Sequence, residues 1–289
     1  MTATRSAGPA LPVIVITGAS SGIGRETAIA FARRGAARLV LVARRTTALQ
    51  ETQRLAMAAG DDGTLEVELL SHDLSAVDAA EQLAADLQQR HQRIDVLVNN
   101  AGAGSDRAFE AEGAVADTDA MLALNLRTPI ALTQLLLPQL IRAGGTVVNV
   151  ASVAGLIGTP NSPVYSSSKW GLVGFSEALD TRVSASGVRV MCVLPGPVPT
   201  PGWPHEQLTA RPILGRLFAS DAGAVARSIV RASERRGGPM QIRPRTYHAA
   251  RLMRLLAPAL VRRVLRRTAR AGASTATTPS SIQTETPSP

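Results

Sequence analysis

Short apolar runs alternate with longer helical patterns along most of the chain. Six runs have the length and composition of buried strands. They cover residues 13–16, 39–43, 65–70, 94–98, 146–151 and 188–194. Helical patterns follow several of these runs, at residues 25–34, about 72–89 and 121–141. Regular alternation of strand and helix predicts an α/β fold with a doubly wound parallel sheet.

Polar residues and glycines follow the predicted strands at their carboxyl ends. Ligands of doubly wound sheets bind at this edge, so residues there are candidates for a site. Six residues that follow strand ends would gather on one rim: Gly18, Arg44, Asp73, Asn99, Ser152 and Pro195. The sequence therefore predicts one ligand site along the carboxyl edge of the sheet.

A glycine-rich segment joins the first predicted strand to the first helix. Its residues are Thr17, Gly18, Ala19, Ser20, Ser21, Gly22, Ile23 and Gly24. Glycines allow close backbone approach, and a helix N-terminus offers free N–H groups to a pyrophosphate. The spacing G-x-x-x-G-x-G differs from the commoner G-x-G-x-x-G. A mobile loop is the alternative, but the strand before and the helix after favour a phosphate cradle.

The second strand ends in Arg44-Arg45, with no acid at Ala43, Arg44 or Arg45. In dinucleotide folds an acid here binds the ribose 2′-hydroxyl, whereas an arginine suits a 2′-phosphate. NADP(H) is therefore favoured over NAD(H), although a solvated arginine pair remains the simpler alternative. Asp73 either caps the helix predicted after it or contacts the adenine, and the sequence leaves both open.

Lys169 is the only lysine among 31 basic residues. Pro163 suits a helix start, and Tyr165 and Lys169 are four residues apart, so both can point into one site. An ammonium at about 4 Å and an effective dielectric of about 20 favours the phenolate by roughly 4 kcal/mol. That equals about three pKa units and would bring Tyr165 to roughly 7, before any desolvation penalty. With Ser152 at a strand end, these groups suit proton transfer at a carbonyl or alcohol oxygen.

Taken together, these residues resemble the short-chain dehydrogenase/reductase family, in its short, single-domain subfamily. The resemblance covers about residues 12–245 and implies a Rossmann-type fold. It rests on Thr17-Gly18-x-x-x-Gly22-x-Gly24, Asp73, Asn99-Asn100-Ala101-Gly102, Asn125, Ser152, Tyr165-x-x-x-Lys169 and Pro195-Gly196-x-x-x-Thr200. The longer subfamily of epimerases and dehydratases fits less well, because its glycine spacing and larger C-terminal lobe are missing.

The resemblance implies a role for each catalytic residue. Tyr165 would be the acid–base, and Lys169 would lower its pKa and bind the nicotinamide ribose. Ser152 would orient the substrate, and Asn125 would hold a water in a proton relay. The residues expected to bind the cofactor are Thr17, Gly18, Ser20, Ser21, Gly22, Ile23, Gly24, Arg44, Asp73, Asn99, Ala101, Gly102, Tyr165, Lys169, Pro195, Gly196, Val198 and Thr200. Of these, Val198 and Thr200 would contact the carboxamide.

The expected reaction interconverts a ketone or aldehyde and an alcohol, with no metal. The segment after Thr200, where the family places its substrate lid, is short and proline-rich. Its apolar residues hint at a lipophilic substrate, although packing of the lid explains them equally: Trp203, Leu208, Ile213, Leu214, Leu217 and Phe218. A dinucleotide-binding sensor or scaffold without catalysis is the alternative function. The complete set of catalytic residues argues against it. Relatives usually form dimers or tetramers, so a homodimer or homotetramer is expected.

The net charge of +9 is concentrated in the C-terminal part of the chain. Residues 1–234 carry 20 basic and 21 acidic residues, whereas residues 235–289 carry 11 arginines and one acid, Glu285. Two amphipathic helical stretches, separated by Pro258, set leucines and valines against arginines. Such helices favour contact with an anionic membrane surface. Packing on the enzyme body is a close alternative, and nucleic acid is less favoured because only Tyr247 could stack on bases.

We expect residues 1–11 to be disordered, 12–245 to form the catalytic domain, 246–270 to be a basic helical tail, and 271–289 to be disordered. The single cysteine, Cys192, excludes an internal disulfide. The sequence shows no apolar signal core and no uninterrupted apolar span. The protein is therefore expected in the cytoplasm. The membrane interpretation of the tail would place it on the inner face of a membrane, whereas packing of the tail on the body would not.

Overall fold

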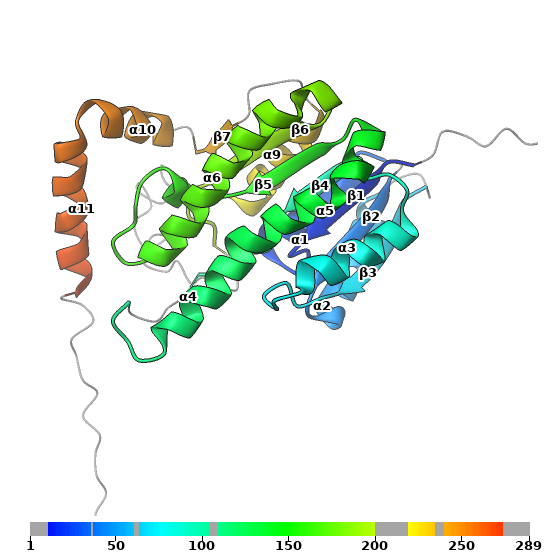
Figure 1. Ribbon diagram of the computed structural model, residues 1–289, viewed down its shortest axis with the longest axis horizontal. Coiled ribbons are helices and arrows are strands. Elements are labelled where there is room, and N and C mark those ends of the chain that lie inside the picture. Colours follow the sequence, from blue (N-terminus) through cyan, green and yellow to red (C-terminus); the bar gives the residue numbers. More distant parts are fainter. Residues whose placement is uncertain are drawn as a thin grey trace, which may run out of the picture.

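The computed structural model describes residues 11–35, 37–60, 64–104, 109–199, 219–234, 240–244 and 246–273. These residues form one parallel sheet of seven strands in the order β3-β2-β1-β4-β5-β6-β7 (Figure 1). Every described strand pair is parallel. The predicted doubly wound, Rossmann-type fold is confirmed.

Six of the seven described strands match the predicted apolar runs to within two residues at each end. The seven strands are β1 Val13–Thr17, β2 Arg38–Ala43, β3 Glu66–Ser71, β4 Val96–Asn99, β5 Thr146–Val150, β6 Arg189–Pro195 and β7 Met240–Arg243. The sequence analysis did not predict β7. This edge strand is four residues long and alternates apolar and polar residues, so it has no continuous apolar run.

Helices cover both faces of the sheet (Figure 1). They are α1 Gly22–Ala32, α2 Thr46–Ala59, α3 Ala79–Arg90, α4 Ala114–Leu122, α5 Thr128–Ala143, α6 Pro163–Val183, α9 Ala222–Glu234, α10 Thr246–Leu256 and α11 Pro258–Ala273. Three short helices complete the described elements: a π-helix η1 at Ala123–Arg127, and 3-10 helices η2 at Val153–Gly155 and η3 at Ser184–Ser186.

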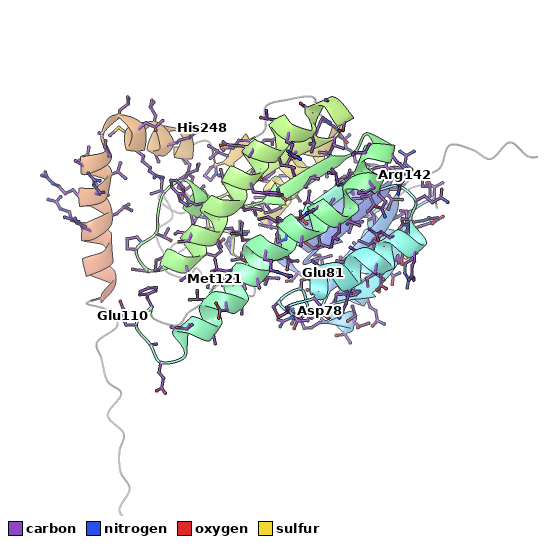
Figure 2. All side chains as sticks on the ribbon, in the orientation of Figure 1. Asp78, Glu81, Glu110, Met121, Arg142 and His248 are labelled. Carbon is purple, nitrogen blue, oxygen red and sulfur yellow. The ribbon has the colours of Figure 1, made fainter. Side chains whose placement is uncertain are left out.

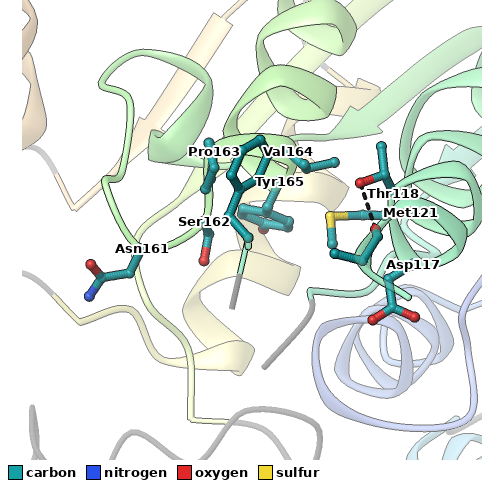
Figure 3. A pocket seen from close by; sticks show the side chains of 10 residues that line it. Asp117, Thr118, Met121, Asn161, Ser162, Pro163, Val164 and Tyr165 are labelled. Carbon is teal, nitrogen blue, oxygen red and sulfur yellow. Dashed lines mark hydrogen bonds between the residues drawn. The ribbon is translucent and has the colours of Figure 1, made fainter. Parts of the chain in front are cut away.

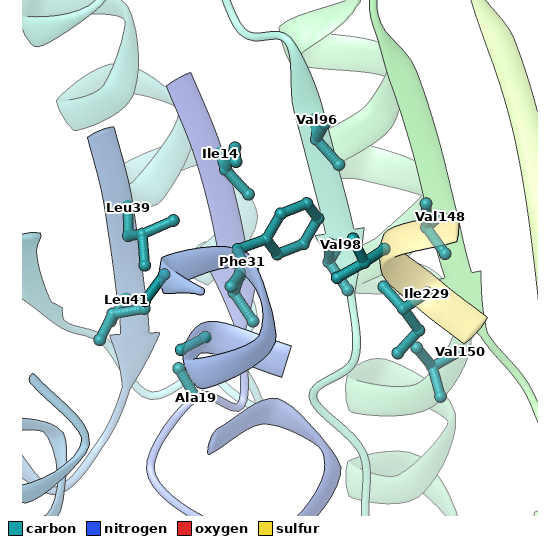
Figure 4. Close-up of a cluster of buried hydrophobic side chains, with 14 of the residues drawn as sticks. Ile14, Ala19, Phe31, Leu39, Leu41, Val96, Val98, Val148, Val150 and Ile229 are labelled. Carbon is teal, nitrogen blue, oxygen red and sulfur yellow. The ribbon is translucent and has the colours of Figure 1, made fainter. Parts of the chain in front are cut away.

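Strand residues alternate between two apolar layers. On one face, Ile16 and Leu41 pack with α1, α2 and α9, and Phe31 of α1 reaches into this cluster (Figure 4). On the other face, Val15 and Val40 pack with α3 and α5. Because both faces are covered, the strands are apolar throughout, which is why their sequence shows continuous runs.

The predicted helix at residues 72–89 begins later than expected, at Ala79. The Asp73 carboxylate accepts hydrogen bonds from the backbone N–H and the hydroxyl of Ser75, at 3.1 and 2.6 Å. This local turn competes with a helix, as is usual for aspartate. Asp73 therefore does not cap α3.

The predicted helix at residues 121–141 is longer, because α4, η1 and α5 run on continuously from Ala114 to Ala143. By length and mean hydropathy, this helix of 30 residues passes the test for a membrane span. The core helix of a folded domain passes the same test, and Leu132, Leu136 and Leu140 are buried against the sheet. The helix is therefore weak evidence for a membrane span.

Two C-terminal helices extend from the α/β body. The chain leaves β7 through α10, turns at Pro258, and continues as α11, which stands apart from the sheet (Figure 1). Side chains that end in nitrogen atoms project from α11 on the side away from the body (Figure 2).

Phe31→Ala should lower the free energy of unfolding by about 3–5 kcal/mol, because it removes a ring that is 5% exposed between α1 and the sheet. Chemical denaturation measures this change. Met57→Ala on α2 is the control, since Met57 is 56% exposed and its loss should cost less than about 1 kcal/mol. Equal costs for the two variants would contradict the assigned core.

Candidate active site

The carboxyl end of β1 is joined to the carboxyl end of β4 by hydrogen bonds. The Thr17 hydroxyl accepts from the backbone N–H groups of Asn100 and Ala101, at 2.9 and 3.0 Å. The Asn100 amide donates to the carbonyls of Thr17 and Gly18, at 2.9 and 3.3 Å. The glycine-rich turn and the Asn-Asn-Ala-Gly segment therefore form one connected wall of the rim.

The glycine-rich turn is folded too tightly for side chains at two positions. Gly18 has a φ of +66°, and a Cβ there would lie 2.8 Å from the Ala101 Cα. A Cβ on Gly24 would lie 2.2 Å from the Gly18 carbonyl oxygen. No described side chain caps the start of α1, where Ser21 is the N-cap residue. The turn and the open helix N-terminus fit a pyrophosphate.

Two basic side chains, Arg44 and Arg25, lie at this end of the sheet. Arg44 is exposed at the end of β2, and its guanidinium lies 3.7 Å from the Asp73 carboxylate. The hydrogen bond from Ser75 is the main cause that lowers the pKa of Asp73. Arg25, which the sequence analysis missed, donates to the Ser20 carbonyl at 2.7 Å. The only indication in the sequence that Arg25 lies beside this turn was its position directly after Gly24.

The Asn99 side chain turns into the protein rather than toward the rim. Its amide donates to Asn149 at 2.8 Å and to Thr133 at 3.2 Å. Its buried Oδ1 has no hydrogen-bond partner among the described residues. Asn99 thus links β4 to β5 and α5 through a buried polar contact, which its position at a strand end could not reveal.

Ser152, Tyr165 and Lys169 come together at the end of β5. The Ser152 side chain hydrogen-bonds Tyr165, and it also accepts from the Ala154 N–H at 3.2 Å. The Lys169 Nζ lies 5.7 Å from the centre of the Tyr165 ring. It donates to the Val150 carbonyl at 3.0 Å. The predicted helical spacing therefore places Tyr165 and Lys169 on the same side of α6.

Burial governs the pKa values in this cluster. It raises the pKa of Tyr165, and the hydrogen bond with Ser152 offsets only part of that rise. It also lowers the pKa of Lys169 from 10.5 to about 8, so this ammonium stays mostly protonated at pH 7. The fall toward 7 that the Coulomb argument gave for Tyr165 is not found, because burial is the largest cause acting on this phenol and it raises the pKa.

Asn125 lies in the π-helix η1 and is fully buried. Its amide donates to the Ala103 carbonyl at 2.8 Å and to the Ser168 hydroxyl at 3.2 Å, while its Oδ1 accepts from the Ala103 N–H at 2.9 Å. Gly102 fits between Asn125 and Lys169: a Cβ there would be 3.0 Å from Asn125 Oδ1 and 3.3 Å from Lys169 Nζ. Asn125 thereby holds the loop after β4 next to Lys169. Such π-helical turns often occur at functional sites.

A pocket, with about 380 Å³ of empty space when the open solvent at its mouth is included, lies between α4 and the N-terminal turn of α6. Figure 3 shows Tyr165 in this pocket, with Ser162 and Pro163 on one side and Thr118 and Met121 of α4 on the other. Phe109 and Asp117 also line it. Apart from Tyr165, the sequence analysis did not assign these residues to the site, because none of them follows a strand end.

Beyond β6, the Gly196 N–H donates to Ser220 at 3.2 Å, and Val198 is buried in the apolar cluster beneath α1 and α9. Thr200 and the apolar lid residues at 203–218 lie outside the described residues. The predicted roles of Thr200 and of the lid therefore stay predictions.

Gly24→Ala should weaken NADPH binding by at least about tenfold, because the added Cβ would collide with the Gly18 backbone and open the turn. Fluorescence titration of NADPH measures the dissociation constant. The matched control is Gly174→Ala in α6, where a Cβ meets nothing within 4 Å. Unchanged NADPH binding in Gly24→Ala would contradict this account of the turn.

Comparison with known proteins agrees with this geometry. The sequence profile of the family described as short chain dehydrogenase matches residues 12–209. An uncharacterized short-chain type dehydrogenase/reductase from Sinorhizobium fredii is 37% identical over 189 residues, which are 65% of this chain and 33% of that protein. This chain thus spans only a third of the length of that relative.

Two further proteins extend the comparison. The 3-oxoacyl-[acyl-carrier-protein] reductase of Synechocystis sp. is 34% identical over 206 residues, which are 70% of this chain and 79% of that protein. The structure of a short-chain dehydrogenase from Sphingobium yanoikuyae in complex with NADPH has a TM-score of 0.71 and 28% identity, and covers 93% of this chain and 98% of that one. The profile match covers well over half of the chain, and the chain belongs to the short-chain dehydrogenase family.

Proposed function

We propose that this protein is an NADP(H)-dependent oxidoreductase that interconverts a lipophilic ketone or aldehyde and the corresponding alcohol. The observation that carries the proposal is the convergence of Ser152, Tyr165 and Lys169 beside the glycine-rich turn. A hydroxyl pair and a buried ammonium suit the oxygen of a carbonyl.

The residues at the rim fit the cofactor. The turn at Gly18 and Gly24 and the start of α1 would hold the pyrophosphate, and Arg44 would hold the 2′-phosphate. The Sphingobium relative contains NADPH, which supports the same cofactor here. Bound NADPH supplies a hydride to the carbonyl carbon.

Tyr165 gives its hydroxyl proton to the carbonyl oxygen during reduction. Because burial raises its pKa, the phenol holds that proton at neutral pH and can act as an acid. Ser152 hydrogen-bonds the same oxygen and orients it. The Lys169 ammonium stabilises the phenolate that remains after transfer, and Asn125 keeps the loop beside Lys169 in place. In the oxidation direction the same proton returns to Tyr165.

Apolar walls support a lipophilic substrate. Phe109, Met121, Pro163 and Val164 line the pocket that contains Tyr165. Phe109 is also 62% exposed, so apolar surface continues from the pocket outward. The Synechocystis relative is named as a 3-oxoacyl-[acyl-carrier-protein] reductase, so its name implies reduction of the 3-oxo group of an acyl chain, and this is consistent with a ketone on an apolar substrate.

The basic tail supports peripheral contact with an anionic membrane, as on the inner face of a cell membrane. Residues 246–273 contain seven arginines and no acid. Arginine near an anionic leaflet is attracted to it. We also propose that the protein is a homodimer or homotetramer, as the family resemblance implies.

Tyr165→Phe should reduce kcat by at least about 100-fold, because it removes the proton donor but keeps the ring. Initial rates of NADPH and NADH oxidation should be measured against ketones from short and polar to long-chain and steroidal. NADPH binding should change by less than about threefold. The control is Tyr247→Phe, which alters the only other tyrosine and should keep full turnover.

Full turnover in Tyr165→Phe would overturn the mechanism. Tight NADPH binding by the unmodified protein without turnover of any ketone would favour the dinucleotide-binding sensor or scaffold instead.

Arg44→Gln should raise the KM for NADPH by about tenfold or more, because one charge-assisted hydrogen bond to the 2′-phosphate is lost. The KM for NADH should change by less than about twofold, since NADH has no such phosphate. Arg54→Gln is the control, because Arg54 pairs with Glu51 on the exposed side of α2. An equal rise of the KM for NADPH and for NADH would show that Arg44 does not recognise the 2′-phosphate.

A further inference from the structure

The helices α10 and α11 carry several large apolar side chains that are exposed. Leu255 and Leu256 are 72% and 73% exposed, and Leu252 is 55% exposed. On α11, Leu260 and Val264 are 47% and 51% exposed. Packing on the enzyme body, the alternative that the sequence left open, is therefore not what the structure shows for these five apolar side chains.

The arginines of the two helices divide into two groups. On α11, Arg262, Arg263, Arg266 and Arg267 are exposed. On α10, Arg254 turns toward the body instead: its guanidinium lies 3.9 Å from the centre of the Trp170 ring and donates to the Leu156 carbonyl. A cation over an indole and a charge-assisted hydrogen bond together hold one guanidinium in place.

Both partners of Arg254 belong to segments that form the active site. Leu156 directly follows η2, the short helix that starts after Ser152. Trp170 is the residue after Lys169 on α6. Arg254 therefore attaches the C-terminal helices to the two segments that carry the proposed catalytic residues.

We propose that residues 246–267 form an arm that lies on an anionic bilayer, and that Arg254 is a positioning residue which fixes this arm to the active-site segments. The proposal rests on the proposed function, because it explains how a lipophilic carbonyl reaches the pocket. Docking of the arm would hold the body at one orientation on the bilayer, and dissolved substrate would then pass to the pocket at Tyr165.

An anionic bilayer fits this surface better than other occupants do. Exposed leucines enter the acyl boundary while arginines meet the phosphate groups. A nucleic acid would pair with the arginines but leave the leucines in water. A second copy of the arm would bring together two surfaces of the same positive charge.

The test uses the full chain with phosphatidylcholine vesicles, with and without one-third phosphatidylglycerol. Co-sedimentation measures vesicle binding, and NADPH oxidation is followed with a short water-soluble ketone and with a long-chain ketone dissolved in the vesicles. The variants are Arg254→Gln and the matched control Arg262→Gln, each of which removes one positive charge. Hydrogen exchange of residues 153–160 is measured with and without saturating anionic vesicles.

The unmodified protein should bind the anionic vesicles at least about tenfold more tightly than the neutral ones. Arg262→Gln should weaken this binding by about fivefold, whereas Arg254→Gln should weaken it by less than about twofold. At saturating vesicles, Arg254→Gln should raise the KM for the vesicle-dissolved ketone at least about fivefold, and Arg262→Gln should not. Both should keep the kcat and KM for the soluble ketone. Vesicles should slow the exchange of residues 153–160 in Arg262→Gln but not in Arg254→Gln.

Several results would overturn the proposal. These are equal binding to neutral and anionic vesicles, binding of a DNA duplex in place of vesicles, and identical behaviour of the two variants. If the soluble ketone is reduced but vesicles do not bind, this proposal fails and the proposed function stands. If vesicles bind without turnover of any ketone, the proposed function fails, and the exchange data still decide the role of Arg254.

Discussion

The site depends on one buried ammonium. Lys169 is 4% exposed, and a charge so far from water is costly unless a hydrogen bond and nearby dipoles compensate it. The Val150 carbonyl at the end of β5 supplies that hydrogen bond. Glycines provide the space: a Cβ on Gly155 would lie 2.7 Å from the Lys169 carbonyl oxygen, and a Cβ on Gly102 would lie 3.3 Å from its Nζ. Sheet, loop and helix thus meet around this one side chain, and an arginine, with its planar fork of donors, is not an equivalent replacement for the compact ammonium.

Most of the sheet could be predicted because the burial of each strand leaves a signal within its own few residues. Strands buried on both faces need continuous apolar runs, and six of the seven strands show them. The short edge strand β7 is held by its pairing with β6 and by long-range packing, so its sequence carries no comparable signal. The start of α3 was predicted too early because the Asp73 carboxylate accepts a hydrogen bond from the nearby Ser75 N–H, and this local turn replaces the first turns of the helix. A periodic pattern of apolar residues does not reveal such a turn.

The site could be predicted in its composition but not in its electrostatics. Spacing along one helix is enough to bring Tyr165 near Lys169. The sign of the pKa shift depends on how much water the fold removes, and in this site burial is the largest cause for both groups: it raises the pKa of Tyr165 and lowers that of Lys169. The direction of a side chain was equally hard to predict. Asn99 lies at the end of β4, which suggested that it faces the rim, but its amide donates inward to Asn149. Successive side chains of a strand point to opposite faces of the sheet, so the side chains of two residues at strand ends can point in different directions.

In the C-terminal arm, the sequence pattern alone does not show which arginines face the solvent and which one holds the arm on the enzyme body. In the sequence, Arg254 is one of seven arginines opposite apolar residues, and all seven look equivalent. What distinguishes it is the indole of Trp170 beneath it, which lies 84 positions earlier in the chain. An arginine stacked on a ring and bonded to a carbonyl has its donors directed into the protein, so it is a poor ligand for a lipid phosphate. The exposed arginines of α11 keep their donors in water, where a phosphate can replace the water. In our proposal, attachment to the body and lipid binding therefore belong to different arginines of one basic pattern. A count of charges alone would not distinguish these two roles.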